Sequence, residues 1–152
     1  MSVTMQQVLA EIDKDEPNYT RAAQLGPEAL PHLRQIVEAD DPLRASKAAY
    51  LASLIPGPGA VEILKTAAQR REPEIRVTVA HALRNTGEAT SELLAGLLDD
   101  QDSGVRKVAL SSVKHLRLPA LREKVARIAQ HDPEAFLRSI AAETISAMDR
   151  VR

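Results

Sequence analysis

The sequence predicts an all-α fold, a right-handed α-α superhelix (solenoid) of about five stacked antiparallel helix pairs. Three observations favour this architecture. A short motif recurs at intervals of roughly 30 residues. Hydrophobic residues make up 44% of the chain while aromatic residues make up only 2%. Glycine and proline interrupt the apolar stretches at intervals similar to those of the motif.

The scarcity of aromatic residues restricts how a core can be built. The 152 residues contain no tryptophan, and the only rings of phenylalanine or tyrosine are Tyr19, Tyr50 and Phe136. A core of alanine, leucine, isoleucine and valine lets helices approach one another closely. This composition favours helix-on-helix packing over a β-sandwich or barrel.

The recurring motif is an apolar residue followed by arginine. It occurs in register at Leu43-Arg44, Ile75-Arg76, Val105-Arg106 and Leu137-Arg138, with the arginines 32, 30 and 32 residues apart. Positions −1, +4 and +7 from each arginine share one face of a helix, so we expect them to form its buried stripe. The residues at +4 and +7 are Ala48 and Leu51, Ala80 and Leu83, Leu110 and Val113, and Ala142 and Ile145.

An acidic residue stands four positions before each arginine, where the helix is expected to begin. Its side chain can accept hydrogen bonds from free backbone N–H groups there. Pro42 and Pro73 fit the same turns, because the first residue of a helix has no N–H bond to lose. We expect each arginine to reach its own acid or the equivalent acid of the next repeat. The four acids are Asp40, Glu72, Asp102 and Glu134.

A partner helix with its own apolar stripe precedes each motif helix, and breakers such as Pro56-Gly57-Pro58-Gly59 separate the units. Residues 1–152 are therefore predicted to form a single repeat domain. A capping repeat covers 1–26, with a helix from Thr4 to Ile12 and another at Tyr19–Leu25. The repeats follow at about 27–56, 57–87, 88–117 and 118–149. The stripes of the partner helices are Leu30, Leu33 and Val37; Val61, Leu64 and Ala68; Leu93, Leu94 and Leu97; and Leu118, Leu121, Val125 and Ile128.

Four segments carry a resemblance to a known family: "ADDPLRASKAAYLASL", "EPEIRVTVAHALRNTG", "DDQDSGVRKVALSSV" and "DPEAFLRSIAAETIS". This pattern resembles the HEAT-like repeat family in its short form, which also occurs in bacterial proteins of the phycobilin-lyase type (PBS-lyase HEAT-like repeats). The resemblance covers roughly residues 17–149. It implies that the arginine-bearing second helices line the concave side of a solenoid.

Composition limits the compartment and the class of partner. The chain has no cysteine, no signal-like start and no apolar run long enough to span a membrane, so we expect a cytoplasmic protein. The net charge of −1 disfavours a general nucleic-acid binder. The charge is nevertheless uneven, because residues 11–41 are mainly acidic and residues 105–130 mainly basic.

The predicted binding surface is the concave face of the second helices, at positions +1, +5 and +8. Its first trio, Ala45, Ala49 and Ala52, is small and apolar. Further along, this face carries histidine and basic side chains, which suits an acidic, partly apolar protein or peptide. The alternative is an ordinary solvated helix surface. The predicted partner-binding residues are His81, Arg84, Lys107, Ser111, Lys114 and Glu143.

No catalytic, cofactor-binding or metal-binding residues are predicted. No nucleophile, base and acid can be grouped, and His81 with His115 supplies only two metal ligands. We therefore predict a monomeric, non-catalytic binding scaffold. One alternative is an accessory protein of the phycobilin-lyase type that holds a tetrapyrrole or its acceptor protein. A second is a DNA-binding HEAT-like domain, which the near-neutral charge and the lack of tryptophan disfavour.

Overall fold

The computed structural model describes residues 2–150, which form ten α-helices, short 3-10 turns and no β-strand. The predicted all-α class is therefore confirmed. A 3-10 turn, η1 (Ala23–Leu25), extends α2, and another, η3 (Leu83–Asn85), extends α6. The helices are α1 (Met5–Ile12), α2 (Tyr19–Ala22), α3 (Leu30–Glu38), α4 (Pro42–Ser53), α5 (Pro58–Ala68), α6 (Pro73–Ala82), α7 (Ser91–Leu98), α8 (Ser103–Leu116), α9 (Arg122–His131) and α10 (Ala135–Asp149).

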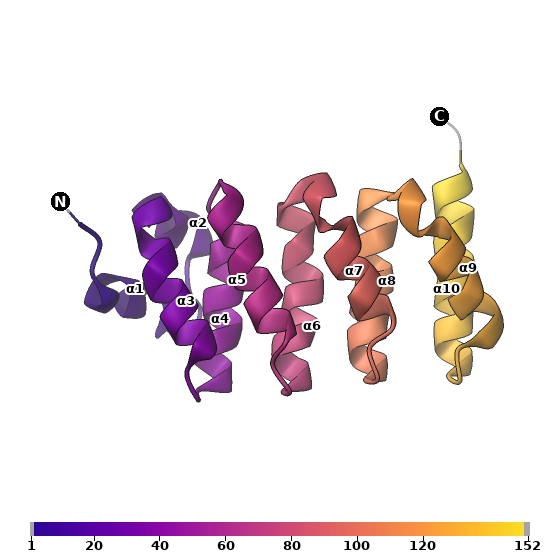
Figure 1. The fold of residues 1–152 in the computed structure, drawn as a ribbon, viewed down its shortest axis with the longest axis horizontal. Helices are drawn as coiled ribbons and strands as arrows, with labels where there is room; N and C mark the ends of the chain where they lie inside the picture. Colours follow the sequence, from indigo (N-terminus) through magenta and orange to yellow (C-terminus); the bar gives the residue numbers. More distant parts are fainter. Residues whose placement is uncertain (1, 151–152) are drawn as a thin grey trace.

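The helices stack as successive pairs into an elongated array with the N-terminus at one end and the C-terminus at the other (Figure 1). The first helices of the pairs, α3, α5, α7 and α9, form one layer. The second helices, α4, α6, α8 and α10, form the other layer, in which each helix packs against the next. This arrangement is the predicted helical solenoid. The division into a cap and four numbered repeats stays a prediction.

Each second helix begins after an acidic residue, as expected. Asp102 Oδ1 accepts hydrogen bonds from the N–H groups of Gly104 and Val105, at 2.8 and 3.1 Å. Glu72 and Glu134 occupy the same position before α6 and α10 without a side-chain capping bond. The prediction was wrong for α4, because Asp41 rather than Asp40 caps this helix.

Because the cap of α4 comes one residue later than the motif predicts, the side chains of α4 are shifted by one position relative to those of the other second helices. Counted from the cap, the position of Arg76 in α6 is held in α4 by Ala45 and not by Arg44. Leu43, predicted to be buried, is consequently 66% exposed. The three alanines predicted to face the groove are fully buried instead: Ala45, Ala49 and Ala52.

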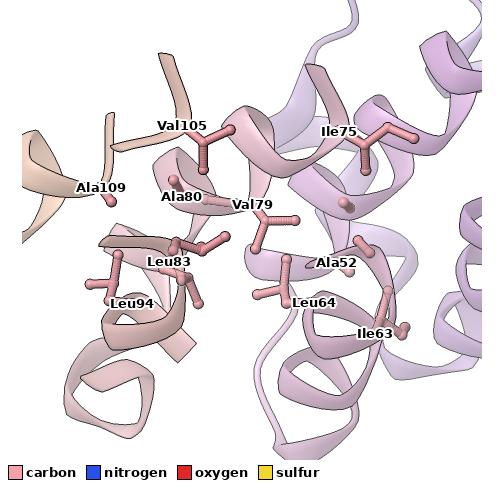
Figure 2. Close-up of a cluster of buried hydrophobic side chains, with 14 of the residues drawn as sticks. Ala52, Ile63, Leu64, Ile75, Val79, Ala80, Leu83, Leu94, Val105 and Ala109 are labelled. Atoms are coloured by element: carbon pink, nitrogen blue, oxygen red, sulfur yellow. The ribbon is translucent and has the colours of Figure 1, made fainter. Parts of the chain in front are cut away.

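The core lies between the two layers and is built from aliphatic side chains. Figure 2 shows Leu64 of α5, Val79 of α6 and Leu94 of α7 gathered with Leu83 between the helices. Most stripe residues of the first helices are buried as predicted, although Leu30, Val61, Ala68 and Leu93 are only partly so. The stripe of the second helices is buried at Ala48, Leu51, Ala80, Leu83, Leu110 and Val113.

The stripe prediction was wrong for α10, where Ala142 is exposed and Ile145 only half-buried. The reason is the place of α10 in the array. Ala80 of α6 is covered by α8, whose Ser112 donates a hydrogen bond to the Ala80 carbonyl at 2.6 Å. Within residues 2–150 no further second helix packs on the outer side of α10. Its +4 position therefore faces outward.

Buried ion pairs link consecutive repeats. Arg76 donates from Nε and Nη2 to the carboxylate of Asp100, at 2.8 and 3.1 Å, and from Nη1 to the Arg70 carbonyl at 2.9 Å. Arg106 repeats this geometry one pair later, with Nε and Nη2 at 2.9 and 3.1 Å from the carboxylate of Asp132. Arg76 and Arg106 therefore reach the next repeat, but the predicted partner was wrong: they bind Asp100 and Asp132, each two residues before the expected acid. Arg138 instead donates to the Asp132 carbonyl at 2.6 Å.

A different arginine links the first of these repeats, α3 with α4, to the next, α5 with α6. Because Ala45 holds the position equivalent to Arg76, α4 offers no guanidinium there. Arg70, which follows α5, supplies a guanidinium that reaches back to the end of α3. Its Nη1 donates to the carbonyls of Val37 and Ala39 at 2.6 and 2.8 Å, while Nε and Nη2 bind Glu72 at 3.2 and 3.0 Å. Arg44 points away and binds Asp13 beyond α1.

Candidate partner-binding face

Two neighbouring hollows lie on the face formed by the second helices. The larger one, here called the tyrosine hollow, has a volume of about 680 Å³ and opens between α2, α4, α6 and α8. Its walls combine aromatic, aliphatic and hydroxyl groups with a single lysine. The lining residues are Tyr19, Ser46, Lys47, Tyr50, Val77, Thr78, His81 and Val108.

Stacked rings form the wall of the tyrosine hollow. The rings of Tyr19 and Tyr50 meet edge to face, with centroids 4.8 Å apart and planes at 71°. The Tyr50 ring stacks on the imidazole of His81, with centroids 5.8 Å apart and planes at 15°. Both tyrosines of the chain therefore line this one hollow. Aromatic rings with polar edges are typical anchors for a partner's side chain.

Burial and neighbouring charges change the pKa of two of these rings. Burial, with a smaller contribution from Tyr50, raises the pKa of the Tyr19 hydroxyl, which keeps it protonated near neutral pH. Burial and the positive charges of Arg84 and His115 lower the pKa of His81 below its ordinary value of 6.5. His81 is consequently neutral near pH 7 and offers one hydrogen-bond donor and one acceptor.

The second hollow, here called the basic hollow, lies beside the ends of α6 and α8 and has a volume of about 400 Å³. Arg84, in η3, projects into it three residues after His81. The Arg84 Nε donates to Ser112 Oγ at 3.0 Å and its Nη2 donates to Ser111 Oγ at 2.6 Å. The described residues that line it include no acidic side chain; they are Arg84, Ser111, Lys114, His115, Arg117, Ala147 and Arg150.

The structure brings together four of the six residues predicted to bind a partner. His81 lies in the tyrosine hollow, and Arg84, Ser111 and Lys114 line the basic hollow. Lys107 of α8 and Glu143 of α10 are exposed but line neither hollow. The sequence analysis missed both tyrosines as site residues, together with Ser46, Lys47, Thr78 and Val108; Val77 lies at a +1 position of the predicted face.

Tyr50 was missed because of the rotation of α4. The proline at the first position of α4 was the usable signal, since the residue before such a proline is the cap. Taking Asp41 as the cap moves Ala45 and Ala49 into the core. It also turns Tyr50 toward the face that His81 occupies on α6.

The basic segment 105–130 is largely neutralised in the folded chain. Arg106 is buried against Asp132, Arg122 binds Asp149, and Lys124 binds Asp99. Three of its cations form no ion pair with any described side chain, residues 88 and 89 being outside that set: Lys107, Lys114 and Arg117. The positive charge left for a partner is therefore concentrated at the basic hollow, with Lys107 outside it.

The described side chains, which exclude those of residues 88 and 89, contain no cluster of three or more histidine, aspartate or glutamate groups arranged to hold a metal ion. Within residues 2–150, no helix combines the length and apolar character that crossing a membrane requires.

Stacked helix pairs with a shared core and an open second-helix face define an α-helical repeat scaffold. A family model for HEAT repeats matches residues 30–114 and, in an overlapping second match, residues 61–146. The chain belongs to the HEAT repeat family, as the resemblance of its four motif segments indicated. A search of curated proteins found no relative that matches this chain.

Proposed function

We propose that this HEAT repeat scaffold binds a segment of another protein along the second-helix face and catalyses no reaction. The tyrosine hollow carries this proposal, because it concentrates the two tyrosines of an aromatic-poor chain at one open surface. The half-buried tyrosine rings, next to Val77 and Val108, can bury an apolar side chain of the partner. The neighbouring basic hollow favours a segment with acidic character.

The test is affinity capture from native lysate, read by mass spectrometry, followed by titration of the purified captured protein. Thr78→Arg fills the tyrosine hollow with a long side chain, and His81→Ala removes the exposed end of the ring stack. Removal of a residue that anchors an interface costs more than about 1 kcal/mol of binding free energy, whereas most other interface residues cost less. Both variants are therefore expected to weaken binding of the captured protein by about fivefold or more.

Lys65→Ala is the matched control, because Lys65 is exposed on α5 in the layer of first helices. It is expected to bind the captured protein with wild-type affinity. Circular dichroism establishes that all three variants keep the helical content of the wild type. Equal affinity of Thr78→Arg, His81→Ala and the wild type would rule out the tyrosine hollow as the binding site.

A further inference from the structure

Two uncharged hydroxyl groups hold the Arg84 side chain in place. Ser112 Oγ donates its own hydrogen to the Ala80 carbonyl at 2.6 Å, so its lone pairs accept from Arg84 Nε at 3.0 Å. Ser111 Oγ accepts from Nη2 at 2.6 Å. The two hydroxyls fix the plane of the guanidinium, and neither carries a charge. Among the described side chains, which leave out those of residues 88 and 89, Arg84 forms no ion pair and its Nη1 has no hydrogen-bond partner.

Other donors surround Arg84 in the same hollow. Lys114 and His115 come from the last turn of α8, and Arg117 follows at its end, where the left-handed backbone (φ 52°) turns the chain. Their position near a helix C-terminus complements the helix dipole, which accounts for Lys114 and His115. It does not account for Arg84, which comes from a different helix and is oriented by serines.

The chemistry of these donors matches one class of ligand. A phosphoryl group carries nearly two negative charges and three acceptor oxygens, whereas a carboxylate carries one charge and two oxygens. A pre-oriented guanidinium with further cations and a hydroxyl in one hollow supplies donors from several directions, as phosphoryl recognition requires. We propose that the basic hollow binds a phosphoryl group, carried as a phosphorylated side chain by the protein segment of the proposed function, on which this second step rests.

The site can be tested without the partner by titrating inorganic phosphate into ¹⁵N-labelled protein at constant ionic strength. NMR is expected to show saturable shifts of the Arg84 Nε–H and of the backbone amides around Ser111 and Lys114. Arg84→Leu and Lys114→Leu are each expected to weaken phosphate binding by about tenfold, the loss of one charge-assisted hydrogen bond.

Lys107→Leu is the matched control, because Lys107 lies on the same helix as Lys114, is also exposed and lines neither hollow. It is expected to bind phosphate as the wild type does. Equal weakening by Lys107→Leu and Lys114→Leu would show only general attraction to positive charge and would overturn the site. The absence of a saturable shift would overturn it as well.

Two further probes define the source of the phosphoryl group. A short phosphoserine peptide is expected to bind at least about tenfold more tightly than the same peptide with glutamate at that position. Equal affinity for the two peptides would assign the hollow to carboxylates. Tighter binding of duplex DNA, lost in Arg84→Leu, would assign it to nucleic acid; either result contradicts the proposal.

The two proposals fail separately. Loss of partner binding in Thr78→Arg and His81→Ala, together with no phosphate binding, would keep the scaffold function and remove only the phosphoryl site. In the opposite case, phosphate binding depends on Arg84 while Thr78→Arg and His81→Ala leave partner binding unchanged. That result would keep the phosphoryl site and remove the tyrosine hollow as the partner's binding site.

Discussion

Helix α6 has an arginine near each end, and the two arginines have different partners. Arg76, in the first turn, is 7% exposed and forms a fork with the carboxylate of Asp100. Arg84, in the 3-10 turn that extends α6, is partly exposed and binds two serine hydroxyls. A carboxylate neutralises the guanidinium, and a hydroxyl only orients it. The same residue type therefore supports the fold at one end and is available to a ligand at the other.

The largest expected effect comes from removing the buried arginine. Arg76→Leu leaves the Asp100 carboxylate buried without its counter-ion, and we expect this to lower the free energy of unfolding by about 3–5 kcal/mol. Urea unfolding followed by circular dichroism measures the loss. The double variant Arg76→Leu/Asp100→Ala is expected to recover part of it, since no unpaired charge remains. A loss below about 1 kcal/mol would show that this pair does not hold the repeats together.

Lowering the pH is expected to reduce the stabilisation that the Arg76–Asp100 ion pair gives the folded wild type. Burial by itself raises the pKa of Asp100 and of Asp132, but hydrogen bonds from Arg76 and Arg106 and nearby positive charges lower both below the ordinary value of 3.8. A carboxyl with a lower pKa in the folded chain stabilises it above the ordinary pKa. That contribution is lost as the pH falls through 3.8 toward the folded-state pKa.

The difference in unfolding free energy between the wild type and Arg76→Leu should therefore shrink between about pH 7 and about pH 3. The measurement is urea unfolding at a series of pH values. A difference that stays constant across this range would mean that the Asp100 carboxylate does not account for the effect of Arg76.

The smallest expected effect belongs to the other end of α6. Arg84→Leu breaks two hydrogen bonds to serines at a partly exposed position, and we expect the unfolding free energy in chloride buffer to change by less than about 1 kcal/mol. The same urea titration measures it. A loss as large as that of Arg76→Leu would contradict the assignment of Arg84 to ligand binding and would make it a second structural arginine.

The fold was predictable from the sequence because burial in a repeat follows a period, and the period is visible in four copies of the motif. The exceptions have physical causes. Asp40 and Asp41 are chemically equal caps, and only Pro42 distinguishes them, so α4 was placed one residue out of register. Ala142 fits the buried pattern but has no following second helix over it within residues 2–150.

The candidate site was less predictable, because its function depends on which charges are already paired. A count of the positive charges in residues 105–130 gives Arg106 and Lys114 equal weight. In the structure Arg106 is buried against Asp132, whereas Lys114 lines the basic hollow. Pairing of this kind connects residues 26 positions apart, as in Arg106 and Asp132, and no local pattern reveals it. The tyrosine hollow, too, forms only when α2, α4 and α6 are stacked.

Urea unfolding of the wild type and of Arg84→Leu, each in chloride and in phosphate at equal ionic strength, tests most directly whether α6 carries both a structural and a ligand-binding arginine. A ligand at ten times its Kd stabilises the folded state by about 1.4 kcal/mol. Phosphate also stabilises proteins in general by exclusion from their surface, and the comparison of the two proteins cancels that contribution. We predict that phosphate stabilises the wild type by more than it stabilises Arg84→Leu. Equal stabilisation of both proteins would contradict a phosphoryl site at Arg84.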